Sequence, residues 1–305
     1  MSTESDDKLA AELVGHLRQI FGRQTGRAAH AKGIVAEGHF TPTAEARALC
    51  TAAVFAGAPR PITVRYSNST ALTDIADTDD NASPHGMGIR FRVGESDNLD
   101  VVAHSFNGFP SPSARDFADL LGAVAESGPE ATKPTALDSY LASHPIAATF
   151  LTSQKPPPES FATLSYFGVN AVTFIDAAGN RTHVRSRLVP QAGERILDAA
   201  ARAAMGPNYL GEEIARRLAR GPVTFDWKAQ VAEAGDRLDD PSTPWPESRR
   251  LVTLGTLAIE RLAADQAAGG KIFFGPGLLP PGIEPADPML KIRDAAYFLS
   301  SKDRQ

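Results

Sequence analysis

Two residues near the end of the chain are of types that together can bind a metal ion. Arg293 and Tyr297 stand four residues apart in the segment DPMLKIRDAAYFLS, and on a helix this spacing places them on one face. A guanidinium beside a phenol favours the phenolate through Coulomb attraction and hydrogen bonding. A phenolate is a hard anionic donor that can ligate ferric iron. The same pair is also common as ordinary helix surface, so both interpretations stay open.

The surrounding sequence predicts the helix that this pair needs. A run rich in proline and glycine covers residues 275–288, and a helical segment of about 287–300 follows it. Pro285 and Pro288 suit its start, because proline fits the first turn of a helix, where the backbone N–H has no partner.

A histidine and a serine form a second candidate pair. His30 lies in GRAAHAKG, just ahead of a predicted strand, and Ser67 ends the strand segment VRYS. The serine hydroxyl could hold one imidazole nitrogen and leave the other free to act as a base. A lone histidine between alanines is more often structural.

Three arginines have no acidic partner nearby in the sequence. They are Arg27, Arg65 and Arg304. They are either surface charges or a clamp for an anionic ligand that carries carboxylates or phosphates.

Composition limits the class of protein. The 305 residues are 42% hydrophobic and 22% charged, with a net charge of −5 and scattered basic residues, so nucleic acid and anionic membranes are poor partner predictions. Cys50 is the only cysteine, which excludes an internal disulfide framework and a cysteine zinc site. The first residues lack the pattern of a signal peptide, and no run of about 18 apolar residues is present. We therefore expect a cytoplasmic protein.

Hydrophobic periodicity predicts about eight strands in two groups of four, with helices between the groups. The predicted strands cover residues 34–40, 62–67, 88–93, 99–105, 171–176, 182–189, 222–232 and 251–262. The predicted helices cover residues 8–22, 113–126, 136–152 and 193–219, the last interrupted at Gly206. There is no regular βα alternation, which favours an α+β fold with an antiparallel sheet or barrel over a parallel sheet. We expect a single domain over residues 1–305.

Four segments, in order, carry a resemblance to the heme catalases, and most closely to the short catalase-related peroxidases. They are GRAAHAKGIVAEGHF, VRYSNST with ADTDDNASPHGMGIRFRV, FDWKAQVAEAGDRLDDPSTPWPE, and PGIEPADPMLKIRDAAY. They span the chain from about residue 20 to 305. The resemblance implies an antiparallel eight-stranded barrel of the catalase type, with helices between its strand groups and a C-terminal helix that supplies the iron ligand.

The resemblance also implies roles for individual residues, matched position by position to the motifs. His30 becomes the distal acid/base, with Ser67 as its hydrogen-bond partner. Tyr297 becomes the proximal ligand of a ferric heme b, and Arg293 keeps it a phenolate. The heme propionates are expected to meet the three arginines at positions 27, 65 and 304. Phe117 corresponds to the aromatic residue that packs on the distal side of the heme.

Two departures from the catalase pattern affect the expected activity. Where catalases carry a distal asparagine, DVVAHSFNGFP places His104 and Ser105, and Asn107 follows later. Without that amide, disproportionation of peroxide should weaken. Ala29 and Ser69 stand where catalases narrow the channel with valines, which implies a wider and more polar entrance. The chain also lacks the C-terminal helical region of full-length catalases, so we do not expect NADPH binding.

The sequence thus predicts a heme peroxidase that reduces hydrogen peroxide and organic hydroperoxides, oxidises small organic donors, and retains weak catalase activity. A homodimer is one expectation for its assembly. Three alternatives stay open: a heme-dependent fatty-acid hydroperoxide lyase or isomerase resembling allene oxide synthase, a non-catalytic heme-binding protein, and a barrel without a cofactor. The His30/Ser67 pair argues against the non-catalytic heme-binding protein, which needs no distal base.

Overall fold

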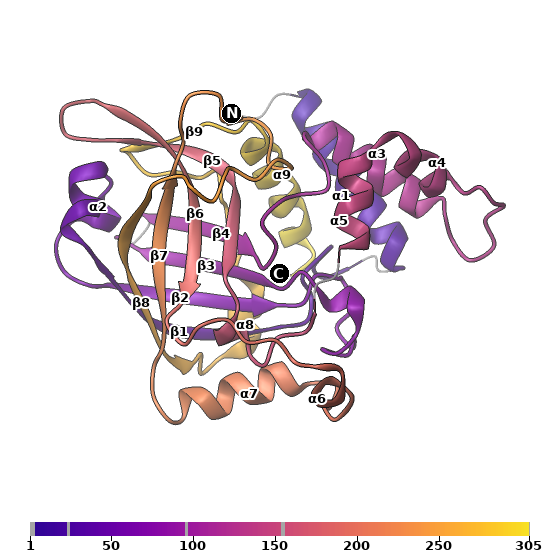
Figure 1. Cartoon of the computed structure of the whole chain (residues 1–305), viewed down its shortest axis with the longest axis horizontal. Coiled ribbons are helices and arrows are strands. Elements are labelled where there is room, and N and C mark those ends of the chain that lie inside the picture. The colour runs from indigo at the N-terminus through magenta and orange to yellow at the C-terminus, as the bar shows by residue number, and fades with distance from the viewer. Residues whose placement is uncertain (1–3, 23–24, 95–96, 154–155, 305) are drawn as a thin grey trace.

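The computed structural model describes residues 4–22, 25–94, 97–153 and 156–304, and an antiparallel barrel occupies its centre (Figure 1). The barrel strands are β1 (Gly33–Pro42), β2 (Arg60–Ser67), β3 (Gly86–Arg92), β4 (Asn98–His104), β5 (Tyr166–Ile175), β6 (Arg181–Pro190), β7 (Val223–Val231) and β8 (Leu251–Leu262). Strands consecutive in the chain are neighbours in space, and β8 returns to pair with β1. A bridge between His104 of β4 and Phe167 of β5 completes the ring.

A short further strand, β9 (Ile283–Pro285), pairs with β5 beyond this bridge. The pairing of β5 with β6 shifts register between Gly168 and Val172. Such a bulge redirects side chains locally, and Asn170 lies within it.

Aromatic side chains fill the barrel interior. Along β7, alternate residues Val223, Phe225 and Trp227 are buried, as the period of a half-buried strand requires. The Trp227 ring stacks on Phe91 with centroids 4.7 Å apart, and Phe40 meets Phe91 edge-on at 5.1 Å. This part of the barrel is therefore a packed core rather than a pore.

Nine helices surround the barrel in the described residues. They are α1 (Glu4–Phe21), α2 (Ala44–Leu49), α3 (Ala114–Ala125), α4 (Ala136–Ser143), α5 (Pro145–Thr152), α6 (Ala199–Ala203), α7 (Tyr209–Leu218), α8 (Gln266–Lys271) and α9 (Met289–Lys302). Short 3₁₀ turns cover Ala53–Phe55, Asp80–Ala82 and Phe161–Thr163. Figure 1 shows α1, α3, α4 and α5 grouped on one side of the barrel, with α9 between this group and the strands. Within the described ranges, no helix is long and apolar enough to cross a membrane.

A second apolar cluster joins the helices to one another. Leu13 of α1, Leu121 of α3, and Met289 and Ile292 of α9 are buried together there, and Phe117 packs against them. The N-terminus of α3 is fixed because the Ser113 hydroxyl accepts the Asp116 N–H. The cluster sets the position of α9, which carries the predicted iron ligand.

The predicted elements differ from the structure mainly at proline and at the edges of strands. The helix predicted over residues 136–152 is two helices, because Pro145 begins a new one after His144. The helix predicted from residue 193 starts only at Ala199, and its predicted interruption at Gly206 lies between α6 and α7. Strand β9 was not predicted.

Candidate active site

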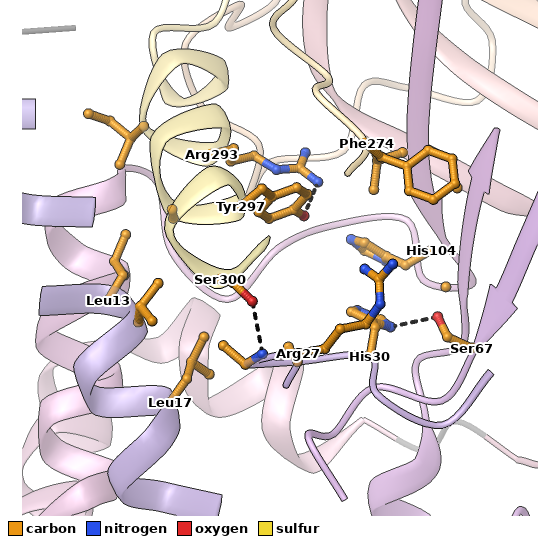
Figure 2. Close-up of a pocket in the computed structure, with 18 of the residues that line it drawn as sticks. Leu13, Leu17, Arg27, His30, Ser67, His104, Phe274, Arg293, Tyr297 and Ser300 are labelled. Carbon is orange, nitrogen blue, oxygen red and sulfur yellow. Dashed lines mark hydrogen bonds between the residues drawn. The ribbon is translucent and has the colours of Figure 1, made fainter. Parts of the chain in front are cut away.

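A cavity of about 250 Å³ lies between the barrel and helices α1, α3 and α9. All of the residues proposed for the site from the sequence line it: Arg27, His30, Arg65, Ser67, Phe117, Arg293, Tyr297 and Arg304. They come from segments up to 277 residues apart, and the fold brings them together. Figure 2 shows Tyr297 and Arg293 on the α9 side, with His30 and Ser67 on the side of the strands.

His30 is held in an unusual backbone conformation. Its φ is 55°, which no other non-glycine residue in the described part of the chain shares, and left-handed backbone is uncommon outside glycine. Its N–H donates to the Ser69 carbonyl at 2.9 Å, and its own carbonyl accepts from the Arg65 guanidinium at 2.8 Å. These bonds offset the strain and fix the direction of the imidazole.

The ring of His30 is positioned by Ser67 and by a glycine. Nδ1 lies 3.1 Å from the Ser67 hydroxyl. A Cβ on Gly86 would lie 2.8 Å from both Nδ1 and that hydroxyl, closer than real Cβ atoms come. Gly86 is therefore required for the pair. It was missed at the sequence level, where it reads only as a turn residue ahead of a strand.

The His30 imidazole is neutral at physiological pH. Burial lowers its pKa to about 3, with further contributions from the charges of Arg65, His104 and Arg27. A neutral imidazole with one nitrogen held by Ser67 keeps its other nitrogen available to accept a proton.

Tyr297 and Arg293 form the pair predicted from their spacing. Nη2 of Arg293 donates to the phenol oxygen at 2.8 Å, and Nη1 donates to the Asn170 side-chain carbonyl. Asn170 in turn donates to the Asp287 carboxylate at 2.7 Å, which also accepts the N–H of Met289. Asn170 and Asp287 were missed. The only signal for Asn170 is an amide inside an apolar strand.

The three arginines gather at one edge of the cavity. Arg27 donates to the Gly270 and Ile272 carbonyls, and Arg304 to the Ser300 carbonyl. Burial lowers the pKa of Arg27 to about 8 and that of Arg65 to about 10, and charge repulsion from the other arginines adds to both shifts. Burial also lowers the pKa of Arg304. Clustered guanidiniums destabilise one another unless an anion joins them.

The environment of these arginines fits such an anion. Among the described residues that line the cavity there is no aspartate or glutamate. Among the residues that the structure describes, the Nε atoms of Arg65 and Arg304 are buried and lack a hydrogen-bond partner. Buried donors of this kind are costly unless a ligand satisfies them. The edge of the cavity is therefore suited to carboxylates such as heme propionates.

Two further groups of hydrogen bonds connect the walls of the cavity. The Ala28 N–H donates to the Ser300 hydroxyl at 3.1 Å, which links α9 to the segment that carries His30. Arg90 forms a bidentate ion pair with Asp100 and donates to the Phe273 carbonyl, and the Gly275 N–H donates to Asp100. These bonds hold Phe274 against the cavity.

The two departures noted in the sequence fall at different places. His104 lines the cavity, whereas the Asn107 amide donates to Glu247 at 3.2 Å and lies outside the lining. Ala29 lines the cavity, but the Ser69 hydroxyl donates to the Asn81 carbonyl instead. Of the two replacements, only Ala29 therefore borders this cavity.

The arrangement as a whole defines a class of protein. A phenol paired with a guanidinium faces an imidazole across a cavity whose edge carries three cations, on an antiparallel barrel. The described residues contain no cluster of three or more His, Cys, Asp or Glu suited to a metal ion. The donor set fits an iron held in a planar, anionic cofactor, as in heme proteins.

Comparison with known proteins agrees with this class. A family model described as catalase matches residues 8–305. A catalase-related peroxidase of Mycolicibacterium paratuberculosis is 35% identical and covers 96% of this chain and 94% of its own length. A catalase-related peroxidase of Synechococcus elongatus is 30% identical, and the match covers 96% of this chain and 88% of the length of that relative. The chain therefore belongs to the catalase family.

Solved structures confirm the fold. A bacterial catalase superposes with a TM-score of 0.79 at 22% identity, and catalase A of Saccharomyces cerevisiae with 0.80 at 19%. Both comparisons cover 93% of this chain, which spans 59% and 62% of those catalases. The predicted antiparallel eight-stranded barrel of the catalase type is thereby confirmed.

Proposed function

We propose that this catalase-family chain, a peroxide oxidoreductase, is a heme-dependent peroxidase that reduces hydrogen peroxide and organic hydroperoxides and oxidises small organic donors. Weak catalase activity accompanies this reaction. One observation carries the proposal: His30 and Tyr297 face one cavity whose edge holds three arginines and, among the described lining residues, no carboxylate.

The cofactor in this proposal is heme b with ferric iron, which supplies the redox chemistry when bound. The phenolate of Tyr297 would ligate the iron. The hydrogen bond from Arg293 stabilises the phenolate over the phenol, and Asn170 holds that guanidinium in place. Arg27, Arg65 and Arg304 would hold the propionates, and Phe117, which lines the same cavity, would pack against the cofactor.

His30 moves the proton in this mechanism. The ring nitrogen that does not contact Ser67 takes a proton from the hydroperoxide and then returns it to the departing oxygen, first as base and then as acid. Ser67 keeps the ring oriented through both transfers. Because the pKa of His30 is lowered to about 3, the imidazole is unprotonated across the physiological range and enters the reaction as a neutral base.

The preference for peroxidase over catalase chemistry follows from the distal wall. His104 lines the cavity where catalases place an amide, and the Asn107 amide is directed to Glu247 instead. Two relatives that match this chain over 94% and 88% of their own length are both named catalase-related peroxidase, which supports the same activity. We also propose a single-domain cytoplasmic protein over residues 1–305 that does not use NADPH, with a homodimer as its assembly.

Turnover of an organic donor tests this function. The heme-loaded protein, given hydrogen peroxide and a dye donor, should oxidise the dye in steady state. His30→Asn should lose about two or more orders of magnitude in kcat/KM, since it removes the general base. A substitution of exposed His39 to Asn serves as the matched control and should change little. Stoichiometric rearrangement of a lipid hydroperoxide without a donor would instead identify a lyase or isomerase.

A further inference from the structure

His104 lies at a junction of the barrel beside the proposed distal site. It is the last residue of β4, pairs with Gly86 of β3, and forms the bridge to Phe167 of β5 that closes the barrel. The next residue, Ser105, exchanges hydrogen bonds with the His85 backbone at 2.9 Å in both directions. The backbone that carries this imidazole is therefore fixed on both sides.

The register places His104 next to the ring of His30. Residues directly opposite each other in an antiparallel pair point to the same face, with Cβ atoms about 4.5–5.5 Å apart. A Cβ on Gly86 would lie 2.8 Å from Nδ1 of His30. The Cβ of His104 is thus within about 8 Å of the His30 ring. Because Gly86 has no side chain, the His30 ring fits over it, opposite the backbone position of His104.

Both imidazoles face the same cavity. His104 and His30 line it together, on the barrel side in Figure 2, and both ring nitrogens of His104 are shielded from solvent. A positive charge on His104 would disfavour protonation of His30 and so adds to the lowering of the pKa of His30. The other charged or titratable side chains that line this cavity are Arg27, Arg65, Arg293, Tyr297 and Arg304.

The chemistry of two neighbouring imidazoles is complementary. A neutral imidazole has one N–H donor and one acceptor nitrogen. If His30 uses its acceptor to take the proton of a hydroperoxide, the oxygen atoms of the ligand still need a donor in a site shielded from water. His104 lines the same cavity as His30 and carries an imidazole, which can supply an N–H donor.

We propose that His104 is a second distal residue, which donates an N–H hydrogen bond to a small ligand bound opposite Tyr297. This inference rests on the proposed heme function. It assigns to His104 the recognition of compact ligands with an acceptor atom, such as peroxide or a halide anion. Its role differs from that of His30, because His104 donates a hydrogen bond where His30 accepts a proton.

Fluoride binding tests the donor without turnover. Fluoride is a small, strong hydrogen-bond acceptor, and its binding to heme-loaded protein can be titrated by absorption spectroscopy. His104→Leu removes the donor and should weaken fluoride binding by about tenfold or more. His104→Gln keeps an N–H group at similar reach and should bind fluoride within about threefold of the unaltered protein. His39→Gln, on the exposed surface beside Glu260, is the control and should bind like the unaltered protein.

The outcomes separate this inference from the function on which it rests. If the unaltered protein gives no heme spectrum, both proposals are wrong. If it binds heme and fluoride but the Leu variant binds fluoride equally well, only the role of His104 is wrong. The role of His104 is also wrong if the Gln variant takes up heme normally yet binds fluoride as weakly as the Leu variant. An N–H donor at this position would then not determine fluoride affinity.

Discussion

At the scale of single residues, the distal site depends on a backbone that most side chains avoid. His30 adopts a φ of 55°, and its peptide groups are held by Ser69 and Arg65. Its ring then fits only because residue 86 has no Cβ. The orientation of the imidazole therefore comes from neighbours that are distant in the sequence rather than from the motif that contains it.

Replacing Gly86 tests this dependence. In Gly86→Ala, the new methyl group would meet Nδ1 of His30 and the Ser67 hydroxyl at 2.8 Å, so one of them must move. We expect peroxidase kcat/KM to fall by about tenfold to a hundredfold, because misplacement by about 1 Å can cost that much. Gly15→Ala on the exposed face of α1 is the control, since a Cβ there would meet nothing within 4 Å. Equal activity in both variants would contradict the positioning role.

The lowered pKa of His30 predicts a pH dependence of stability in the apoprotein. The unfolded chain protonates this histidine below about pH 6.5, whereas the folded protein does so only near its pKa of about 3. The free energy of unfolding should therefore fall as the pH drops through this window, and His30→Asn should remove about 1–2 kcal/mol of the loss between pH 7 and pH 5. Urea denaturation at both pH values measures it. An identical loss in the variant would contradict the buried neutral imidazole.

Sequence patterns identified the residues that act through spacing or motif, and missed those that act through the fold. Arg293 and Tyr297 interact as their four-residue spacing predicts. Asn170 supports them only because a bulge in β5 and the position of α9 bring it there. Such contacts depend on strand register, which composition and periodicity do not specify.

At the scale of elements, helix α9 connects both sides of the cavity. It carries Arg293 and Tyr297, while Ser300 in its last turn accepts the Ala28 N–H two residues before His30. Just beyond its end, Arg304 donates back to the Ser300 carbonyl and hydroxyl. One helix thus positions the proposed iron ligand, a cation of the arginine cluster and the segment that bears the proposed distal base.

The end of α9 should influence retention of the cofactor. In Arg304→Ala, the loss of one cation at the propionate edge should increase the rate of heme transfer to an excess of apomyoglobin by about tenfold. Lys302→Ala changes a cation that stacks on exposed Phe298 in the same turn and should have little effect. If both variants lose heme at the rate of the unaltered protein, Arg304 is an ordinary surface charge.

Element prediction succeeded where hydrophobic periodicity was long and failed where tertiary pairing decided the structure. Strand β8 has the predicted bounds, Leu251–Leu262. Strand β9 spans three residues after a proline-rich run, and only its pairing with β5 makes it a strand. No local pattern of apolar residues indicates such a segment.

At the scale of the whole molecule, the packed core and the proposed ligand cavity occupy different regions of the fold. The aromatic interior around Trp227 stabilises the barrel, and the apolar cluster of α1, α3 and α9 holds the helices. The cavity lies between the barrel and this helical cluster. Its lining includes Leu13 of α1, Phe117 of α3 and Met87 of β3. A ligand in it contacts both, so binding should couple the helices to the barrel.

Heme titration of the apoprotein tests the central claim most directly. Hemin added to the unaltered protein should give a Soret band that saturates at one equivalent, with a resonance Raman iron–phenolate stretch. Tyr297→Phe should lose that stretch and its spectrum, while circular dichroism shows the barrel intact. A protein that gives no saturable Soret band, or a Tyr297→Phe variant whose spectrum is unchanged, would contradict a heme held by Tyr297 opposite His30.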